Sequence, residues 1–188
     1  MCGICGFTEA TERDLPVLKA MCDIMAHRGP DGEGLYIADG IALGHRRLSL
    51  IDLKGGSQPM VRRDGSPDSP LSSPEPHSAG EPAAAGEAPT LAAGDWAIVF
   101  NGEIYNYRDI AAELAAEGWQ LKTSSDTEVL LTGYIAWGEA ILDKVRGMFA
   151  FAIWNRAERT LFCARDFFGI KPFYYTMQNG QFIFASEI

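Results

Sequence analysis

The sequence predicts an α+β fold in which antiparallel sheets are layered against helices. Short apolar segments separated by turn residues gather at both ends of the chain, whereas segments with helical spacing fill its middle. Strands that follow one another through short turns pair antiparallel, unlike the alternating strands and helices of a parallel sheet. A length of 188 residues with 47% hydrophobic residues suits one globular domain, residues 1–188, with some irregular chain.

The first part of the chain predicts one helix and three strands. Apolar side chains recur at helical spacing from Leu15 to Met25, and the Gly- and Pro-containing sequence at 28–32 ends this helix. Asp39-Gly40 is a typical two-residue hairpin turn between two apolar runs. The expected strands are 2–7, 35–37 and 41–45.

The second part predicts a strand, then helices, then four strands. The strand at 96–100 is expected to end at Asn101-Gly102. Ser125 or Asp126 is the expected N-cap of the second of three helices. The expected helices are 107–117, 126–137 and 139–145, and the expected strands that follow are 148–154, 160–164, 172–176 and 182–185.

Residues 64–95 differ in composition from the rest of the chain. They hold six of the ten prolines, many Ser, Ala, Gly and Glu residues, and few apolar side chains. Such a segment buries too little apolar surface to offset the entropy lost on ordering. We expect a disordered surface insertion between two strands, acting as a linker or a lid, and no domain boundary.

The charge balance excludes some classes of partner. There are 16 Lys and Arg residues against 25 Asp and Glu residues, a net charge of −9. A chain this acidic repels a phosphate backbone, so nucleic acid is not expected as a partner. No apolar run reaches the roughly 18 residues of a membrane helix, and the N-terminus does not resemble a signal peptide. We therefore expect a cytoplasmic protein without membrane contact.

The four cysteines are Cys2, Cys5, Cys22 and Cys163. Cys2 and Cys5 have the C-x-x-C spacing of zinc and redox sites, but a structural zinc site needs a second pair of ligands, and the three histidines stand singly. Removal of Met1 would make Cys2 the first residue, and its α-amino group could then act as general base for its own thiol. The alternatives are a metal or redox pair, or a small apolar residue at the start of a strand.

Eight motifs, in order along the chain, resemble the glutaminase domain of glutamine-hydrolysing asparagine synthetases. This domain is a class II glutamine amidotransferase and an N-terminal nucleophile hydrolase. The resemblance implies a four-layer αββα sandwich of two antiparallel sheets. The motifs are CGICGF (2–7), HRGPDGEG (27–34), GHRRLSLIDL (44–53), GSQPM (56–60), FNGEIYNY (100–107), SSDTEVLL (124–131), RGMFAFAIW (146–154) and ARDFFGIKPFYY (164–175).

The resemblance also implies a site. Cys2 is the nucleophile that forms a thioester with glutamine. The side-chain amide of Asn101 and the backbone N–H of Gly102 form the oxyanion hole, although Asn-Gly is also a common turn. Substrate-binding roles fall to Arg47 for the α-carboxylate, to Glu103 and Asp126 for the α-ammonium, and to backbone groups around Ile51, Asp52, Leu53 and Gln58.

The implied reaction is hydrolysis of glutamine to glutamate and ammonia, and the ammonia would supply a synthetase domain that makes asparagine from aspartate. We expect no metal or cofactor in this domain, because ATP and Mg²⁺ belong to the synthetase domain, which would be joined in cis or act in trans. A homodimer of the full-length protein is compatible with this function. The alternative class is a catalytically silent glutamine-binding module.

Overall fold

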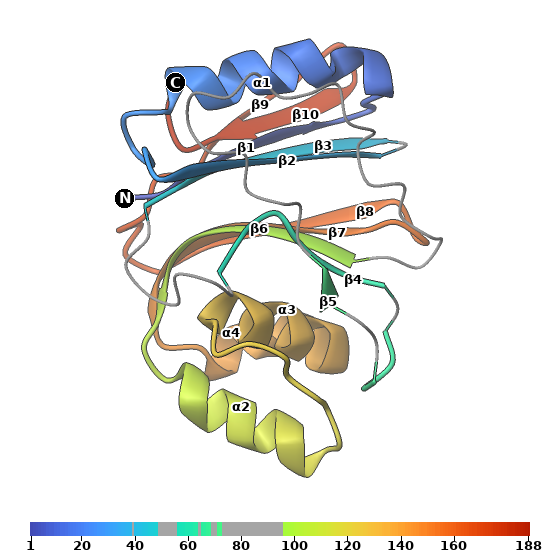
Figure 1. Cartoon of the computed structure of the whole chain (residues 1–188), viewed down its shortest axis with the longest axis vertical. Helices are drawn as coiled ribbons and strands as arrows, with labels where there is room; N and C mark the ends of the chain where they lie inside the picture. Colours follow the sequence, from blue (N-terminus) through green and yellow to red (C-terminus); the bar gives the residue numbers. More distant parts are fainter. Residues whose placement is uncertain (39, 49–55, 64, 69–70, 73–95) are drawn as a thin grey trace.

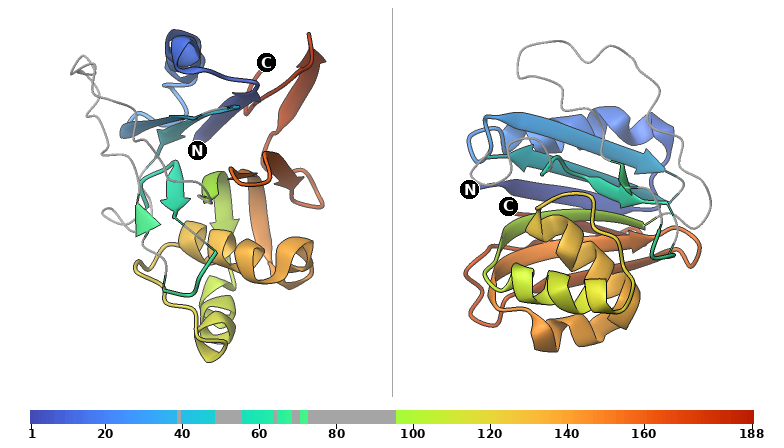
Figure 2. Two further views of the ribbon diagram at one scale, coloured as in Figure 1. Left: turned by 90° about the vertical axis from the view of Figure 1, so that its right-hand side faces the viewer. Right: turned by 60° about the horizontal axis from the view of Figure 1, so that its bottom comes forward.

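A computed structural model describes residues 1–38, 40–48, 56–63, 65–68, 71–72 and 96–188, and every structural statement below refers to these residues. The chain forms four layers, with two five-stranded antiparallel sheets between outer layers of helices (Figure 1). This arrangement confirms the αββα sandwich expected from the resemblance. Figure 2 shows the same layers from two further sides.

The first sheet contains both ends of the chain. Its strand order is β2-β3-β1-β10-β9, so β1 lies in the middle and pairs with β3 on one side and β10 on the other. Helix α1 (Leu15–Ile24), which follows a short 3₁₀ helix at Glu12–Asp14, covers the outer face. The strands are β1 (Gly3–Thr8), β2 (Gly32–Ala38), β3 (Ile41–Arg47), β9 (Tyr174–Gln178) and β10 (Gln181–Ala185).

The β2–β3 hairpin has the expected two-residue connection. Ala38 pairs with Ile41, and Gly40 has a φ of 94°, a conformation that glycine adopts without strain. The last two strands form a second hairpin, and β9 lies two residues later than the predicted 172–176.

The second sheet has the order β5-β4-β6-β7-β8. Its centre is the pair β6–β7, which stays in register from Trp96 opposite Asn155 to Ile104 opposite Gly147. The expectation that the strand ends at Asn101-Gly102 is therefore wrong, because the pairing with β7 carries these residues on as a strand. The strands are β4 (Met60–Arg62), β5 (Leu71–Ser72), β6 (Trp96–Ile104), β7 (Gly147–Asn155) and β8 (Thr160–Arg165).

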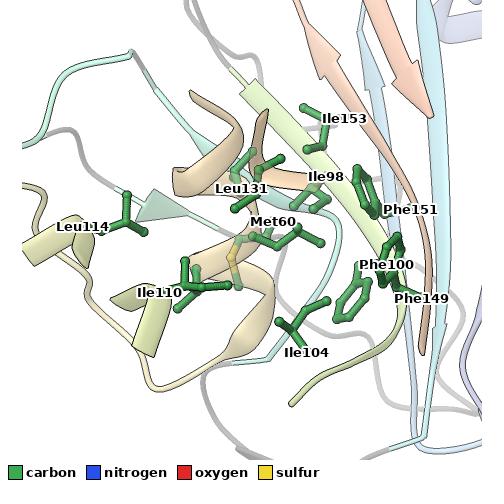
Figure 3. Close-up of a cluster of buried hydrophobic side chains, with 13 residues drawn as sticks. Met60, Ile98, Phe100, Ile104, Ile110, Leu114, Leu131, Phe149, Phe151 and Ile153 are labelled. Atoms are coloured by element: carbon green, nitrogen blue, oxygen red, sulfur yellow. The ribbon is translucent and has the colours of Figure 1, made fainter. Parts of the chain in front are cut away.

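Helices α2 (Tyr107–Ala116), α3 (Asp126–Trp137) and α4 (Ile141–Lys144) cover the outer face of the second sheet, with a 3₁₀ turn at Gly138–Ala140 before α4. Figure 3 shows apolar side chains from the sheet, such as Ile98 and Phe151, in one cluster with Leu131 and with Ile110 from α2. A second apolar cluster lies between the two sheets and a third lies beneath α1. Each sheet face thus buries alternate residues of its strands.

An ion pair buried in the second sheet connects β4 to α3. The side chains of Arg62 and Glu128 are both 0% exposed, and Arg62 Nη1 lies 4.0 Å from Glu128 Oε1. Arg62 Nη1 also donates to Thr132 Oγ1 at 3.1 Å. Glu128 accepts from the backbone N–H groups of Lys122 (2.8 Å) and Thr123 (2.6 Å). These bonds fix the chain just before α3.

Part of the predicted insertion is held by the same arginine. Arg62 Nη2 donates to Pro67 O at 2.8 Å, and the N–H of Gln120 donates to the same oxygen at 3.2 Å. Residues 65–68 are thereby bonded to the fold, and 71–72 form β5, which differs from the expectation of a wholly disordered insertion. Residues 64, 69–70 and 73–95 of this segment lie outside the described residues.

We predict that Arg62→Met lowers the free energy of unfolding by about 3 kcal/mol, because it leaves the Glu128 carboxylate buried without its cation. Chemical denaturation at pH 7 measures this change. Arg62→Met combined with Glu128→Gln is expected to recover much of the loss. A single variant as stable as the unmodified protein would contradict a structural role for the pair.

Candidate functional site

A cavity of about 380 Å³ holds nearly all the residues expected at the site. Residues of the first sheet, of β6 in the second sheet and of the N-terminus of α3 line it, and the N-terminus of the chain lies at the level between the sheets (Figure 1). The expected residues in its lining are Cys2, Arg47, Gln58, Asn101, Gly102, Glu103 and Asp126. Ile51, Asp52 and Leu53 lie outside the described residues.

Cys2 precedes β1 and is held at the cavity by backbone contacts. Its Sγ accepts from the N–H of Leu48 at 3.4 Å and lies 3.7 Å from the oxygen of the same residue. Arg28 Nε donates to the carbonyl oxygen of Cys2 at 3.1 Å, and the amino group of Met1 donates to the oxygen of Arg28 at 3.1 Å. The loop before β2 thus braces the start of the chain against the cavity.

The two cysteines of the C-x-x-C sequence lie in different environments. Side chains alternate across a strand, so that Cys5 belongs to the cluster beneath α1, where its Sγ lies 3.6 Å from that of Cys22. Cys2 lines the cavity instead. Among the described residues, no group of three or more His, Cys, Asp or Glu side chains is placed to hold a metal ion.

Asn101 and Gly102 lie in the interior of β6. Asn101 is 1% exposed, and within the described structure its Nδ2 has no hydrogen-bond partner. A buried donor without an acceptor costs about 1–3 kcal/mol, and an oxygen of a ligand in the cavity would satisfy it. Any side chain at Gly102 would collide with β7, since a Cβ there would lie 2.3 Å from the oxygen of Met148. Close pairing of the strands therefore requires glycine.

Opposite charges line other parts of the cavity. Arg47 ends β3, Glu103 lies on β6 and Asp126 begins α3. Ser125 is the N-cap, since its hydroxyl accepts from the N–H of Thr127 at 3.2 Å, so Asp126 is not needed for that role. The described residues of the cavity thus offer one guanidinium and two carboxylates, the groups that bind the two ends of a free amino acid.

Burial raises the pKa of Asp126 above its usual range. Backbone N–H groups of Ile104 and Thr127 oppose this shift by bonding the charged form, and the negative charge of Glu103 adds to it. Asp126 Oδ2 accepts from the N–H of Ile104 at 3.0 Å. A cationic ligand group beside Asp126 would relieve the cost of burying this charge.

The side chain of Gln58 forms hydrogen bonds with two of the elements that line the cavity. Its Oε1 accepts from the N–H of Phe100 at 2.6 Å, and its Nε2 donates to Thr127 Oγ1 at 3.3 Å. The side chain therefore connects β6 with the start of α3. Contact with a ligand through backbone groups near Gln58 stays a prediction.

Two ionisable side chains of the described cavity lining were not assigned from the sequence, His45 and Lys171. Burial lowers the pKa of His45 to about 3, and the charge of Arg47 contributes in the same direction, against a hydrogen bond with the backbone of Phe100. His45 is therefore neutral near pH 7, and its Nε2 has no partner among the described residues. The GHRR motif drew attention to this segment of the sequence, but it gave no sign that His45 would be buried.

Two ionisable residues of the quoted motifs, His27 and Asp166, lie outside this lining. His27 lies at the surface, where its Nε2 contacts the carboxylate of Glu187 at 3.0 Å. Asp166 accepts from the N–H groups of Phe149, Ile170 and Lys171, and these bonds lower its pKa against the opposing effect of burial.

Among the described helices, none has the length and apolar character that a membrane span requires.

Comparison with known proteins identifies relatives over the whole chain. The model of the glutamine amidotransferase domain family matches residues 1–68 and 79–188. Asparagine synthetases [glutamine-hydrolyzing] 3 and 1 of Bacillus subtilis (strain 168) are 37% and 39% identical over the full chain. The chain spans about a quarter of the length of these relatives, 27% and 26% respectively.

A solved structure with the same fold is glutamine phosphoribosylpyrophosphate (PRPP) amidotransferase from B. subtilis. The two chains superpose with a TM-score of 0.69 at 20% sequence identity. The match covers 98% of this chain and 42% of the other. At this identity the likeness concerns the fold.

We predict that Asp126→Asn raises the free energy of unfolding at pH 7.5. A carboxyl group with a raised pKa in the folded chain favours folding below its unfolded pKa and loses this contribution as pH rises through the folded pKa. Asparagine lacks that dependence but retains an acceptor for the N–H of Ile104. The stability gap between the two proteins should shrink as pH falls toward about 4.

Denaturation across this pH range measures the gap. Asp109→Asn on α2, outside the cavity lining, controls for loss of a negative charge. A gap that widens on acidification would contradict the assigned cause.

Proposed function

Because the chain belongs to the class II glutamine amidotransferase domain family, we propose that it hydrolyses the side-chain amide of glutamine through a thioester on Cys2. The observation that carries this proposal is the unpartnered Nδ2 of Asn101 in the same cavity as the Cys2 thiol. A nucleophile and a buried, fixed donor facing one cavity are the two elements that acyl transfer requires.

The proposed mechanism begins with removal of Met1, which frees the α-amino group of Cys2. This amino group takes the thiol proton while Sγ bonds to the amide carbon of glutamine, and the carbonyl electrons move onto oxygen. Asn101 Nδ2 and the N–H of Gly102 stabilise that oxyanion. As the carbonyl reforms, the C–N bond breaks, and the nitrogen takes the proton and leaves as ammonia.

Water completes the proposed cycle. The same amino group takes a proton from water as the water oxygen bonds to the thioester carbon, and a second oxyanion forms at the same donors. The C–S bond then breaks, sulfur recovers a proton, and glutamate leaves. The net change is glutamine and water to glutamate and ammonia, and every group that acts on the substrate belongs to this chain without a metal or cofactor.

Substrate recognition in the proposal uses the charges of the cavity. Arg47 would hold the α-carboxylate with its planar guanidinium, and Glu103 and Asp126 would bind the α-ammonium. The raised pKa of Asp126 supports this role, since the ligand cation would compensate for its burial. Backbone groups around Ile51 and Gln58 would complete the contacts.

We also propose that the ammonia passes to a synthetase domain or subunit, joined in cis or acting in trans, that makes asparagine from aspartate with ATP and Mg²⁺. The support is the identity of 37–39% to asparagine synthetases, of which this chain matches about a quarter. Residues 1–188 would form the glutaminase domain. All four cysteines are free, as is usual in the reducing cytoplasm, where we place the protein.

We predict that Asn101→Ala lowers kcat for glutamine hydrolysis by roughly 10²–10³-fold with little change in KM, because Asn101 contacts the oxyanion more strongly than the ground-state carbonyl. Steady-state release of ammonia measures both constants. Cys2→Ala should abolish turnover but retain glutamine binding in calorimetry.

The matched control is Asn179→Ala, a change in the turn between β9 and β10, which lies outside the cavity lining. It should leave both constants unchanged. Full turnover in Cys2→Ala would refute the thioester mechanism, and a change confined to KM in Asn101→Ala would exclude the oxyanion role.

A further inference from the structure

Lys171 contributes a charge to the cavity that the proposed reaction leaves unassigned. It lies at the end of the turn that follows β8, and its backbone is fixed from both sides. Its N–H donates to Asp166 Oδ2 at 3.0 Å, and its carbonyl accepts from Arg165 Nε at 2.6 Å. The turn thereby places a lysine in the cavity lining beside Cys2 and Met1.

The Lys171 ammonium lacks a carboxylate partner in the described part of the chain. The residue is only 6% exposed, and Nζ donates to the thioether sulfur of Met1 at 3.4 Å. A thioether is a weak, neutral acceptor, so it compensates little of the cost of burying a cation. An anionic ligand group beside Lys171 would therefore compensate for the burial of its charge.

Met1 connects this lysine with the nucleophile. Met1 is bonded to Cys2, it is 56% exposed, and its side chain covers the ammonium. Removal of Met1, which the proposed function requires, takes away the sulfur that Nζ contacts. The ammonium would then face the part of the cavity that contains Cys2.

Negative charge develops in that part of the cavity during the proposed reaction. The side-chain amide of bound glutamine is neutral there, whereas the tetrahedral intermediates carry an oxyanion and the product glutamate carries a γ-carboxylate. Arg47, Glu103 and Asp126 are already assigned to the α-carboxylate and α-ammonium. Among the described basic side chains that line the cavity, Lys171 is thus the one left for the reacting end.

We infer that Lys171 is an electrostatic residue of the active site, uncovered by removal of Met1, which stabilises the negative charge that forms at the substrate side chain. This inference rests on the proposed function. Lys171 would then stabilise the negatively charged transition state more than the neutral substrate, and it would favour binding of glutamate over glutamine.

The test compares Lys171→Met with Lys171→Arg in the Met1-free protein. Lys171→Met should lower kcat about tenfold while KM for glutamine changes less than about twofold, because the lost attraction acts on charge absent from the substrate amide. The inhibition constant of glutamate should rise about tenfold. Lys171→Arg should recover most of both effects.

Lys144→Met is the matched control, since Lys144 lies on α4, pairs with Glu113, and does not line the cavity. Thermal unfolding of each variant checks the fold. Equal values of kcat and of the glutamate constant in Lys171→Met and Lys144→Met would overturn the inference but leave the proposed function intact. A parallel rise in KM and loss of kcat would also overturn it. Failure of the unmodified protein to hydrolyse glutamine would refute both.

Discussion

Two-sided pairing of β1 is the constraint on which the site depends. Because β3 and β10 bond this strand on both edges, the first residues of the chain are held inside the sandwich. The alternation of side chains then turns Cys5 toward α1, while Cys2 lies at the cavity. A nucleophile at a free chain end would otherwise be mobile, and its thiol would lie at no fixed distance from the groups of the second sheet.

In the second sheet, strand β6 holds the opposite side of the cavity in a fixed position. β6 is paired through nine positions with β7, so backbone bonds fix Asn101, whose Nδ2 has no hydrogen-bond partner in the described structure. Burial of this amide, of the Asp126 carboxylate and of the Lys171 ammonium costs free energy, and the apolar clusters on both faces of the sheet offset that cost. The Asn101 amide, the Asp126 carboxylate and the Lys171 ammonium are all groups that a charged amino acid could bind.

Local sequence patterns predicted much of the framework. Helix α3 has the expected bounds of Asp126 to Trp137, because a capping residue and uninterrupted helical sequence define it. The two-residue turn before Ile41 also formed as expected. The number of layers came from the resemblance to a known family, since short strands do not reveal how they divide between two sheets.

Other features depend on contacts between distant segments and could not be predicted. Asn101-Gly102 has the composition of a turn, and only pairing with β7 makes it a strand. Arg62 and Glu128 are polar residues whose burial follows from their meeting across the sheet and α3. Cys2, Arg47, Asn101 and Asp126 were expected at one site, whereas His45 and Lys171 were not, because their burial beside these residues is a property of the fold.

The most direct measurement is mass spectrometry of the intact protein and of its N-terminal peptide, before and after exposure to an electrophilic diazo-ketone analogue of glutamine, with and without excess glutamine. A nucleophilic Cys2 at the mature N-terminus requires loss of Met1 and one adduct, on Cys2, that glutamine prevents. Retention of Met1, or labelling of Cys5, Cys22 or Cys163 without protection by glutamine, would contradict that role.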